Sequence, residues 1–142
     1  MNPKKILIVD DDVIIVNRLM HALSAGGYSV LTAGDGSEAV SIVRHEKPDL
    51  ILLDITFPPD VAHGGGVAWD GFTIIEWLHR MDEVKGIPII VITGSEAEKY
   101  RARSLAAGAV GFFRKPIDHG ELLTTVRGIL GENSPGSGSP GA

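Results

Sequence analysis

The sequence predicts an α/β fold in which five short apolar strands alternate with five helices. The strand-like runs are continuously apolar rather than alternating, so we expect parallel strands that helices cover on both faces. The segments between them carry apolar residues at helical spacing. Four of the apolar runs end abruptly in a carboxylate, a hydroxyl or an amine. Open α/β sheets bind ligands at the carboxyl ends of their strands, so this edge is the predicted functional site.

Composition limits the class of protein. The chain has 142 residues, of which 44% are apolar, and this suits a single domain with a sizeable core. The formal net charge of −5 argues against direct binding of nucleic acid, and the absence of cysteine excludes disulfides and thiolate metal ligands. The sequence has neither a signal-peptide pattern nor an apolar run long enough to span a membrane. We therefore expect a cytoplasmic protein with no membrane partner.

The first half of the chain predicts three strands and two helices. The strands are expected at about residues 5–10, 28–33 and 50–53. The first helix ends near the glycines at 26–27, and its apolar residues at helical spacing are Val13, Val16, Met20 and Leu23. The second helix opens with DGSE at residues 35–38, which has the spacing of a capping box, and it ends before Pro48.

The second half predicts three helices and two strands. Asp70 is the expected cap of the third helix, whose apolar face carries Phe72, Ile75 and Leu78. A strand at 87–92 precedes a helix that opens with SEAE at 95–98 and ends at Gly108. A last strand at 110–113 leads to a helix capped at Asp118, and its expected inward residues are Leu122, Val126, Ile129 and Leu130.

The composition changes at residue 131. From there the chain is rich in Gly, Ser and Pro and has no apolar periodicity. We therefore expect a domain over residues 1–130 and a flexible tail over 131–142. The tail is open to three interpretations, namely a linker to a further segment, a natural end or a cloning remnant.

Acidic side chains follow two of the predicted strands. The runs ILIVDDD at 6–12 and LILLD at 50–54 place Asp10, Asp11 and Asp54 at one edge of the sheet. Neighbouring carboxylates repel one another, which raises their pKa values, and a hard divalent cation relieves the repulsion. Mg²⁺ suits such a site because it binds one or two carboxylates together with waters and phosphate oxygens. The simpler alternative is helix capping, which we favour for Asp12.

Asp54 is the candidate nucleophile, because a carboxylate can accept a phosphoryl group as an aspartyl phosphate. After the fourth strand, Thr93 offers a hydroxyl donor, and Lys115 offers an ammonium to a phosphate oxygen after the fifth. Pro116 bends the chain there, with a cis peptide bond as one option. Taken singly, each residue has an ordinary alternative as a turn residue or a solvated charge. Taken together, they predict a site that receives a phosphoryl group.

These motifs together resemble the receiver domain of two-component response regulators. They are ILIVDDD at 6–12, DLILLD at 49–54, VITGS at 91–95 and GAVGFFRKP at 108–116, and the resemblance spans about residues 4–130. It implies a flavodoxin-like sandwich with a parallel sheet of order 2-1-3-4-5. It places the first and fifth helices on one face and the other three on the opposite face. It implies a phosphoacceptor switch that is not a conventional enzyme but assists its own phosphorylation and dephosphorylation.

The resemblance also implies how the phosphoryl group arrives and how a metal is held. Asp54 would be phosphorylated by a histidine kinase or a phosphotransfer protein. Asp11, Asp54 and the backbone carbonyl of Thr56 would bind Mg²⁺ directly, and Asp10 would act largely through water. These assignments come from the family and not from the spacing of the residues.

The same resemblance implies a route from the site to a partner. Thr93 and Lys115 would grip the phosphoryl group, and Phe112 would turn inward when Thr93 moves. Phe112 replaces the tyrosine that is usual in the family, so a hydroxyl-mediated latch is not available. The fourth helix, fifth strand and fifth helix would then present a changed surface to an output domain, a partner protein or a second copy.

One segment departs from the family pattern. Between Asp54 and the Asp70-Gly71 pair, the chain is about nine residues longer than is usual. We expect the stretch Pro59–Trp69 to form a lid or a partner contact beside Asp54, with a tolerated insertion as the equal alternative.

Other classes of function remain open. An aspartyl-nucleophile phosphatase typically carries a second Asp two residues after the nucleophile, where this chain has Thr56. A flavodoxin-like cofactor module would bring a phosphate against three carboxylates, which repel it unless a metal is present. A phosphorylation-independent scaffold is compatible with the residues, although they do not require it.

Overall fold

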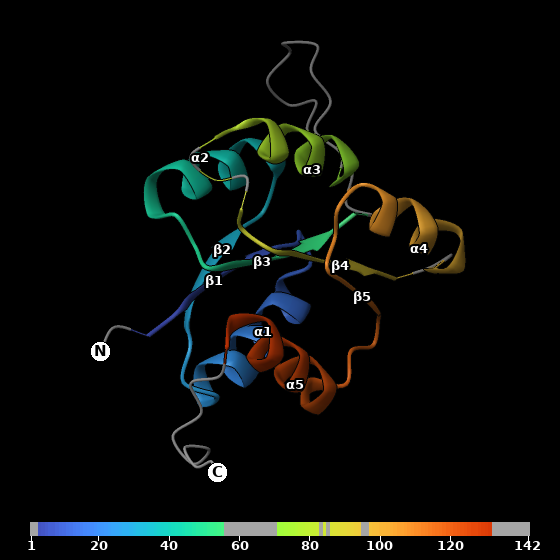
Figure 1. The fold of residues 1–142 in the computed structure, drawn as a ribbon. Helices are drawn as coiled ribbons and strands as arrows, with labels where there is room; N and C mark the ends of the chain where they lie inside the picture. The colour runs from blue at the N-terminus through green and yellow to red at the C-terminus, as the bar shows by residue number, and fades with distance from the viewer. Residues whose placement is uncertain (1–2, 56–70, 83, 85, 95–96, 132–142) are drawn as a thin grey trace.

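Five parallel strands form one sheet at the centre of the molecule (Figure 1). The computed structural model describes residues 3–55, 71–82, 84, 86–94 and 97–131, without the side chains of 71–73 and 97–100. The strands lie in the order β2-β1-β3-β4-β5. Their bounds are Lys5–Val9 for β1, Ser29–Ala33 for β2, Leu50–Asp54 for β3, Ile89–Thr93 for β4 and Gly111–Arg114 for β5. The expected parallel sheet and its order are therefore confirmed.

Helices cover both faces of this sheet. In Figure 1, α1 and α5 lie below it, and α2, α3 and α4 lie above it. Their bounds are Val13–Ala25 for α1, Gly36–Glu46 for α2, Gly71–Arg80 for α3, Ala97–Ala106 for α4 and His119–Leu130 for α5. Every residue of β3 and β4 is buried, as expected for parallel strands that are covered on both sides. Two separate apolar clusters, one per face, make up the core.

The register of the strands brings their carboxyl ends to one edge. Val9, the last residue of β1, pairs with Leu53 of β3, and Asp54 pairs with Ile92 of β4. On the far side, Thr93 pairs with Arg114 of β5. The residues that end β1, β3, β4 and β5 therefore lie in one row, and this row is the predicted functional edge.

Aspartate caps begin three of the helices. Asp12 accepts hydrogen bonds from the backbone N–H groups of Ile14 and Ile15, at 3.0 Å and 3.3 Å. Asp35 and Asp118 do the same for α2 and α5. These contacts satisfy backbone donors that a helix leaves unpaired at its start. The capping role expected for Asp12 is confirmed, and this carboxylate points into its own helix.

The predicted apolar face of α1 was partly wrong. Val13 leaves 69% of its surface exposed, whereas Leu19 and Leu23 are fully buried. Val13 is the first residue of the helix, where the chain has only just left the edge of the sheet. The inward stripe therefore follows Ile15, Leu19 and Leu23, which lie at the same four-residue spacing.

Some expectations fall outside the described residues. They are the cap at Asp70, the capping box at 95–98, the loop Pro59–Trp69, the carbonyl of Thr56 and the tail at 132–142. Within the part of the chain that the structure describes, no helix is both long and apolar enough to cross a membrane.

Candidate functional site

Three aspartates meet at the carboxyl edge of the sheet. Asp10 follows β1 and is 3% exposed, Asp54 ends β3 and is 2% exposed, and Asp11 is open to solvent. One carboxylate oxygen from each lies within 4.8 Å of the others. The sequence predicted this convergence, and the strand register explains it, because β1 and β3 are neighbours that end at the same level.

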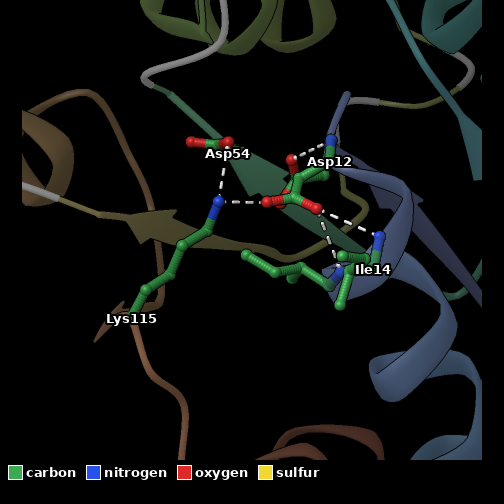
Figure 2. A network of polar contacts seen from close by, with 6 residues as sticks. Asp12, Ile14, Asp54 and Lys115 are labelled. Atoms are coloured by element: carbon green, nitrogen blue, oxygen red, sulfur yellow. Dashed lines mark hydrogen bonds and ion pairs between the residues drawn. The ribbon is translucent and has the colours of Figure 1, made fainter.

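The amine of Lys115 lies between the two buried carboxylates. Its Nζ atom is 2.9 Å from Oδ2 of Asp10 and 3.0 Å from Oδ2 of Asp54, as Figure 2 shows for the contact with Asp54. Lys115 follows β5, and its backbone N–H donates to the carbonyl of Thr93 at 2.8 Å. The peptide bond to Pro116 is cis. The structure thus brings the lysine to the acidic cluster, where it is the counter-ion of two aspartates.

Burial makes Asp10 an unusual carboxyl group. Its pKa is raised to about 6, mainly because the charged form loses solvation and also because Asp54 is close. The backbone N–H of Asp12, which donates to Oδ1 at 2.9 Å, and the amine of Lys115 both oppose this rise. For Lys115 itself, burial alone would lower the pKa, but the hydrogen bonds and charges of Asp10 and Asp54 outweigh burial and raise it.

The donor set fits a hard divalent cation. Three carboxylates face one ammonium, so the formal charge of the cluster is −3 + 1 = −2. Two of these carboxylates are buried, where uncompensated negative charge is costly, and the exposed third leaves a side open to solvent. Oxygen ligands of this kind are those that Mg²⁺ prefers. The set would therefore hold Mg²⁺ through Asp10, Asp11 and Asp54, while the contribution of Thr56 stays a prediction.

Thr93 lies beside the acidic cluster. It ends β4, the strand next to Asp54, and it is completely buried. Its backbone carbonyl holds the backbone of Lys115 in place. The hydroxyl-bearing residue and the lysine that the sequence singled out therefore come from adjacent strand ends.

Phe112 has a partner that the sequence did not reveal. The ring is half-buried on β5, where it pairs with Val91 and packs against the apolar cluster beneath α2 and α3. The guanidinium of Arg101, on α4, lies 5.5 Å from the centre of the ring. The sequence did not reveal this contact, because spacing within one helix cannot show which strand residue a side chain will meet.

The sheet order of this chain is that of CheY-like receiver domains. The chain belongs to the response regulator receiver domain family, whose profile matches residues 6–127. In this family, the receiver domain of a two-component system is the part that accepts the phosphoryl group.

Named relatives agree with this assignment. The chain is 34% identical to the response regulator MprA of Mycobacterium sp. (strain KMS) over 136 residues, which is 96% of this chain and 54% of MprA. It is 32% identical over 126 residues to the protein PilH of Pseudomonas aeruginosa, covering 89% of this chain and 97% of PilH. The chain thus spans about half the length of MprA but nearly all of PilH.

Solved structures have the same architecture. A CheY-like receiver domain protein from Methanospirillum hungatei JF-1 superposes with a TM-score of 0.77 at 29% identity, covering 92% of this chain and 95% of that one. The receiver domain of a signal transduction histidine kinase from Syntrophus aciditrophicus gives a TM-score of 0.77 at 28% identity, over 98% and 96% of the two chains. Proteins with this fold therefore include a response regulator receiver domain protein and a histidine kinase.

Proposed function

We propose that this receiver domain is a phosphorylation switch in which Asp54 accepts a phosphoryl group. One observation carries the proposal: a buried carboxylate is paired with a lysine amine at 3.0 Å at the functional edge of the sheet. Two more carboxylates lie within 4.8 Å. This arrangement gathers a candidate nucleophile, a lysine cation and a set of candidate metal ligands in one place.

The proposed donor is a phosphohistidine of a histidine kinase or a phosphotransfer protein. An oxygen of Asp54 forms a bond to phosphorus while the phosphorus–nitrogen bond of the donor breaks. The imidazole nitrogen keeps the electron pair of that bond and the phosphoryl group becomes an acyl phosphate. At the same time the amine of Lys115 leaves the carboxylate and pairs with a phosphoryl oxygen, and the hydroxyl of Thr93 donates to another.

Asp10, Asp11 and Asp54, together with the carbonyl of Thr56, are proposed to hold Mg²⁺. When bound, the ion neutralises negative charge on the carboxylates and on the phosphoryl oxygens. The charge of the donor set favours this assignment, because Lys115 compensates only part of it. The domain is not proposed to be a conventional enzyme, although its own residues assist both phosphorylation and hydrolysis.

The signal is proposed to leave through α4, β5 and α5. Thr93 moves toward the phosphoryl group and Phe112 turns inward behind it. Leu105 on α4 and Val110, just before β5, leave 46% and 52% of their surfaces exposed. Exposed apolar side chains of this kind suit contact with an output domain, a partner protein or a second copy.

The start of α1 is where a donor protein would dock. Val13 and Ile14 leave 69% and 65% of their surfaces exposed, immediately after the acidic cluster. An apolar surface next to a phosphoacceptor suits a protein donor, because docking would cover it and exclude water from the reaction. The proposal also includes a cytoplasmic location, where the kinase domain that supplies the phosphoryl group would lie. It includes a domain over residues 1–130 that is followed by a tail.

Acetyl phosphate tests the proposal without a kinase. In Mg²⁺, the intact mass of the wild type is expected to rise by one phosphoryl group, and Asp54→Asn is expected to stay unlabelled. Asp35→Asn is the matched control, because asparagine still caps α2 and the site is untouched. A wild type without a mass shift, with folding verified by circular dichroism, would favour the phosphorylation-independent scaffold. Turnover of phosphate from a phosphomonoester would instead favour the phosphatase.

A further inference from the structure

A groove lies behind Lys115, on the face of the sheet that α1 and α5 cover. Its volume is about 390 Å³, which lies within the range of small-molecule sites. Its floor and walls are apolar, and they consist of Ile15, Leu19, Pro116 and Ile117. Leu19 is 1% exposed and Ile15 is partly buried, so the floor is already part of the core. The packing of the core therefore fixes the floor of the groove.

Basic side chains line the apolar groove. Besides Lys115, the lining contains Arg18 of α1 and His119, the first residue of α5. No carboxylate is among the lining residues that the structure describes, although the whole chain carries a net charge of −5. The nearest acid in sequence, Asp118, accepts from the backbone N–H of Glu121 and lines a different hollow. The chemistry that matches this lining is an apolar body with one anionic group.

Lys115 belongs to both the groove and the acidic cluster. It lines the groove, while its amine contacts Asp10 and Asp54. A molecule packed in the groove would therefore rest against the same side chain that pairs with the phosphoacceptor. Contact with this lysine would restrict a movement of its amine from the carboxylates to an incoming phosphoryl oxygen.

We propose that this groove binds a small amphiphilic anion, namely an apolar body with one carboxylate or sulfonate, and that the bound molecule slows phosphorylation of Asp54 through Lys115. Arg18 and His119 bind the anionic group, and Ile15, Leu19 and Ile117 contact the apolar body. The second half of the proposal rests on the function proposed above, whereas the binding itself does not. A small molecule fits the observations better than a protein segment, because the hollow is compact and its floor is buried.

Binding is tested first, with 8-anilinonaphthalene-1-sulfonate as the probe and in the absence of any phosphodonor. The wild type is expected to bind one equivalent saturably, with amide shifts in nuclear magnetic resonance spectra at Ile15, Leu19 and Ile117. Arg18→Glu is expected to bind about tenfold more weakly, because it removes a charge-assisted contact. Arg44→Glu, on exposed surface of α2 at the opposite face, is the matched control and is expected to bind normally.

Three results would overturn the binding site. They are no saturation up to about 1 mM probe, equal affinity in Arg18→Glu and wild type, or shifts centred on the surface around Leu105 and Val110. Thermal melting of each variant verifies that the fold is intact. Should Arg18→Glu fail to fold, Arg18→Gln takes its place, since it removes the charge without adding a new one.

Regulation is tested next, with acetyl phosphate and Mg²⁺. Saturating probe is expected to lower the labelling rate of the wild type by at least about threefold, and Arg18→Glu is expected to need about tenfold more probe for the same effect. Bound probe with an unchanged rate in the wild type would refute the regulation. A wild type that takes no phosphoryl group even without probe would refute the proposed function, and with it the regulation, while the binding experiment still decides the groove.

Discussion

Asp10 shows at the scale of one residue why the site attracts cations. Its carboxyl group is buried, its pKa is raised to about 6, and the amine of Lys115 is shared with Asp54. Because the folded protein binds this proton more tightly than the unfolded chain, the group stabilises the fold below its ordinary pKa of 3.8. This stability is lost as the pH rises through about 6.

The first prediction follows from this loss of stability with rising pH. In metal-free buffer at pH near 7, Asp10→Asn is expected to raise the free energy of unfolding by on the order of 1–3 kcal/mol, because it removes a buried charge. The difference between variant and wild type is expected to grow between about pH 4 and pH 6. Urea unfolding at several pH values measures it, with Asp35→Asn as control. A difference that does not change with pH would contradict the assignment.

Mg²⁺ is expected to make the wild type more stable than Asp10→Asn, which is the reverse of their order in metal-free buffer. Mg²⁺ should stabilise the wild type increasingly as its free concentration rises above the dissociation constant, because only the folded chain assembles the three carboxylates. Asp11→Asn is expected to lose most of this stabilisation, whereas Asp12→Ser, which keeps the cap of α1, is expected to keep most of it. Melting temperatures with and without Mg²⁺ separate the two residues. If both variants lost the same amount of stabilisation by Mg²⁺, the binding would depend only on the net charge of this region.

Arg101 and Phe112 provide a third residue-scale prediction. A cation above an aromatic ring at a partly exposed site contributes about 0.5–1 kcal/mol, and the distance here is 5.5 Å. Arg101→Ala is therefore expected to lower the free energy of unfolding by about that amount, and the loss should vanish in a Phe112→Leu background. The four proteins of this double-mutant cycle are compared by urea unfolding. A coupling energy indistinguishable from zero would show that the contact does not stabilise the fold.

At the scale of elements, two glycines should respond in opposite ways to the same substitution. Gly108 follows α4 with a φ of +112°, and a Cβ atom there would overlap the ring of His79. Gly108→Ala is expected to lower the free energy of unfolding by about 1–3 kcal/mol. Gly128 lies within α5 with nothing within 4 Å of an added Cβ, so Gly128→Ala is expected to raise it by up to about 1 kcal/mol. Urea unfolding measures both, and equal effects of the same sign would contradict the backbone assignment.

The elements also indicate how far sequence reasoning reaches. All strands and helices were predicted within a few residues, because their apolar periods differ and because aspartates and glycines mark their ends. The inner face of α1 was partly wrong, since stripes that begin at Val13 and at Ile15 both have helical spacing. Only the position of the helix relative to the edge of the sheet leaves Val13 exposed. Periodicity alone does not contain that information.

At the scale of the molecule, residue patterns predicted a parallel sheet, whereas the order of its strands came from the resemblance to receiver domains. Once that order is known, the meeting of Asp10, Asp54, Thr93 and Lys115 follows from the register. Two features were beyond prediction. The contact of Arg101 with Phe112 and the groove behind Lys115 both depend on how separate elements pack, which no local motif encodes.

The most direct measurement of the central claim is a crystal structure with Mg²⁺ and beryllium fluoride, which mimics a phosphoryl group on a carboxylate. We expect beryllium on an oxygen of Asp54, Mg²⁺ on Asp11 and Asp54, and the amine of Lys115 moved from its present 3.0 Å contact with Asp54 to a fluoride. The hydroxyl of Thr93 is expected to contact a second fluoride. A structure in which Asp54 stays unmodified and Lys115 keeps both aspartates, at concentrations that saturate Mg²⁺ binding, would contradict the account.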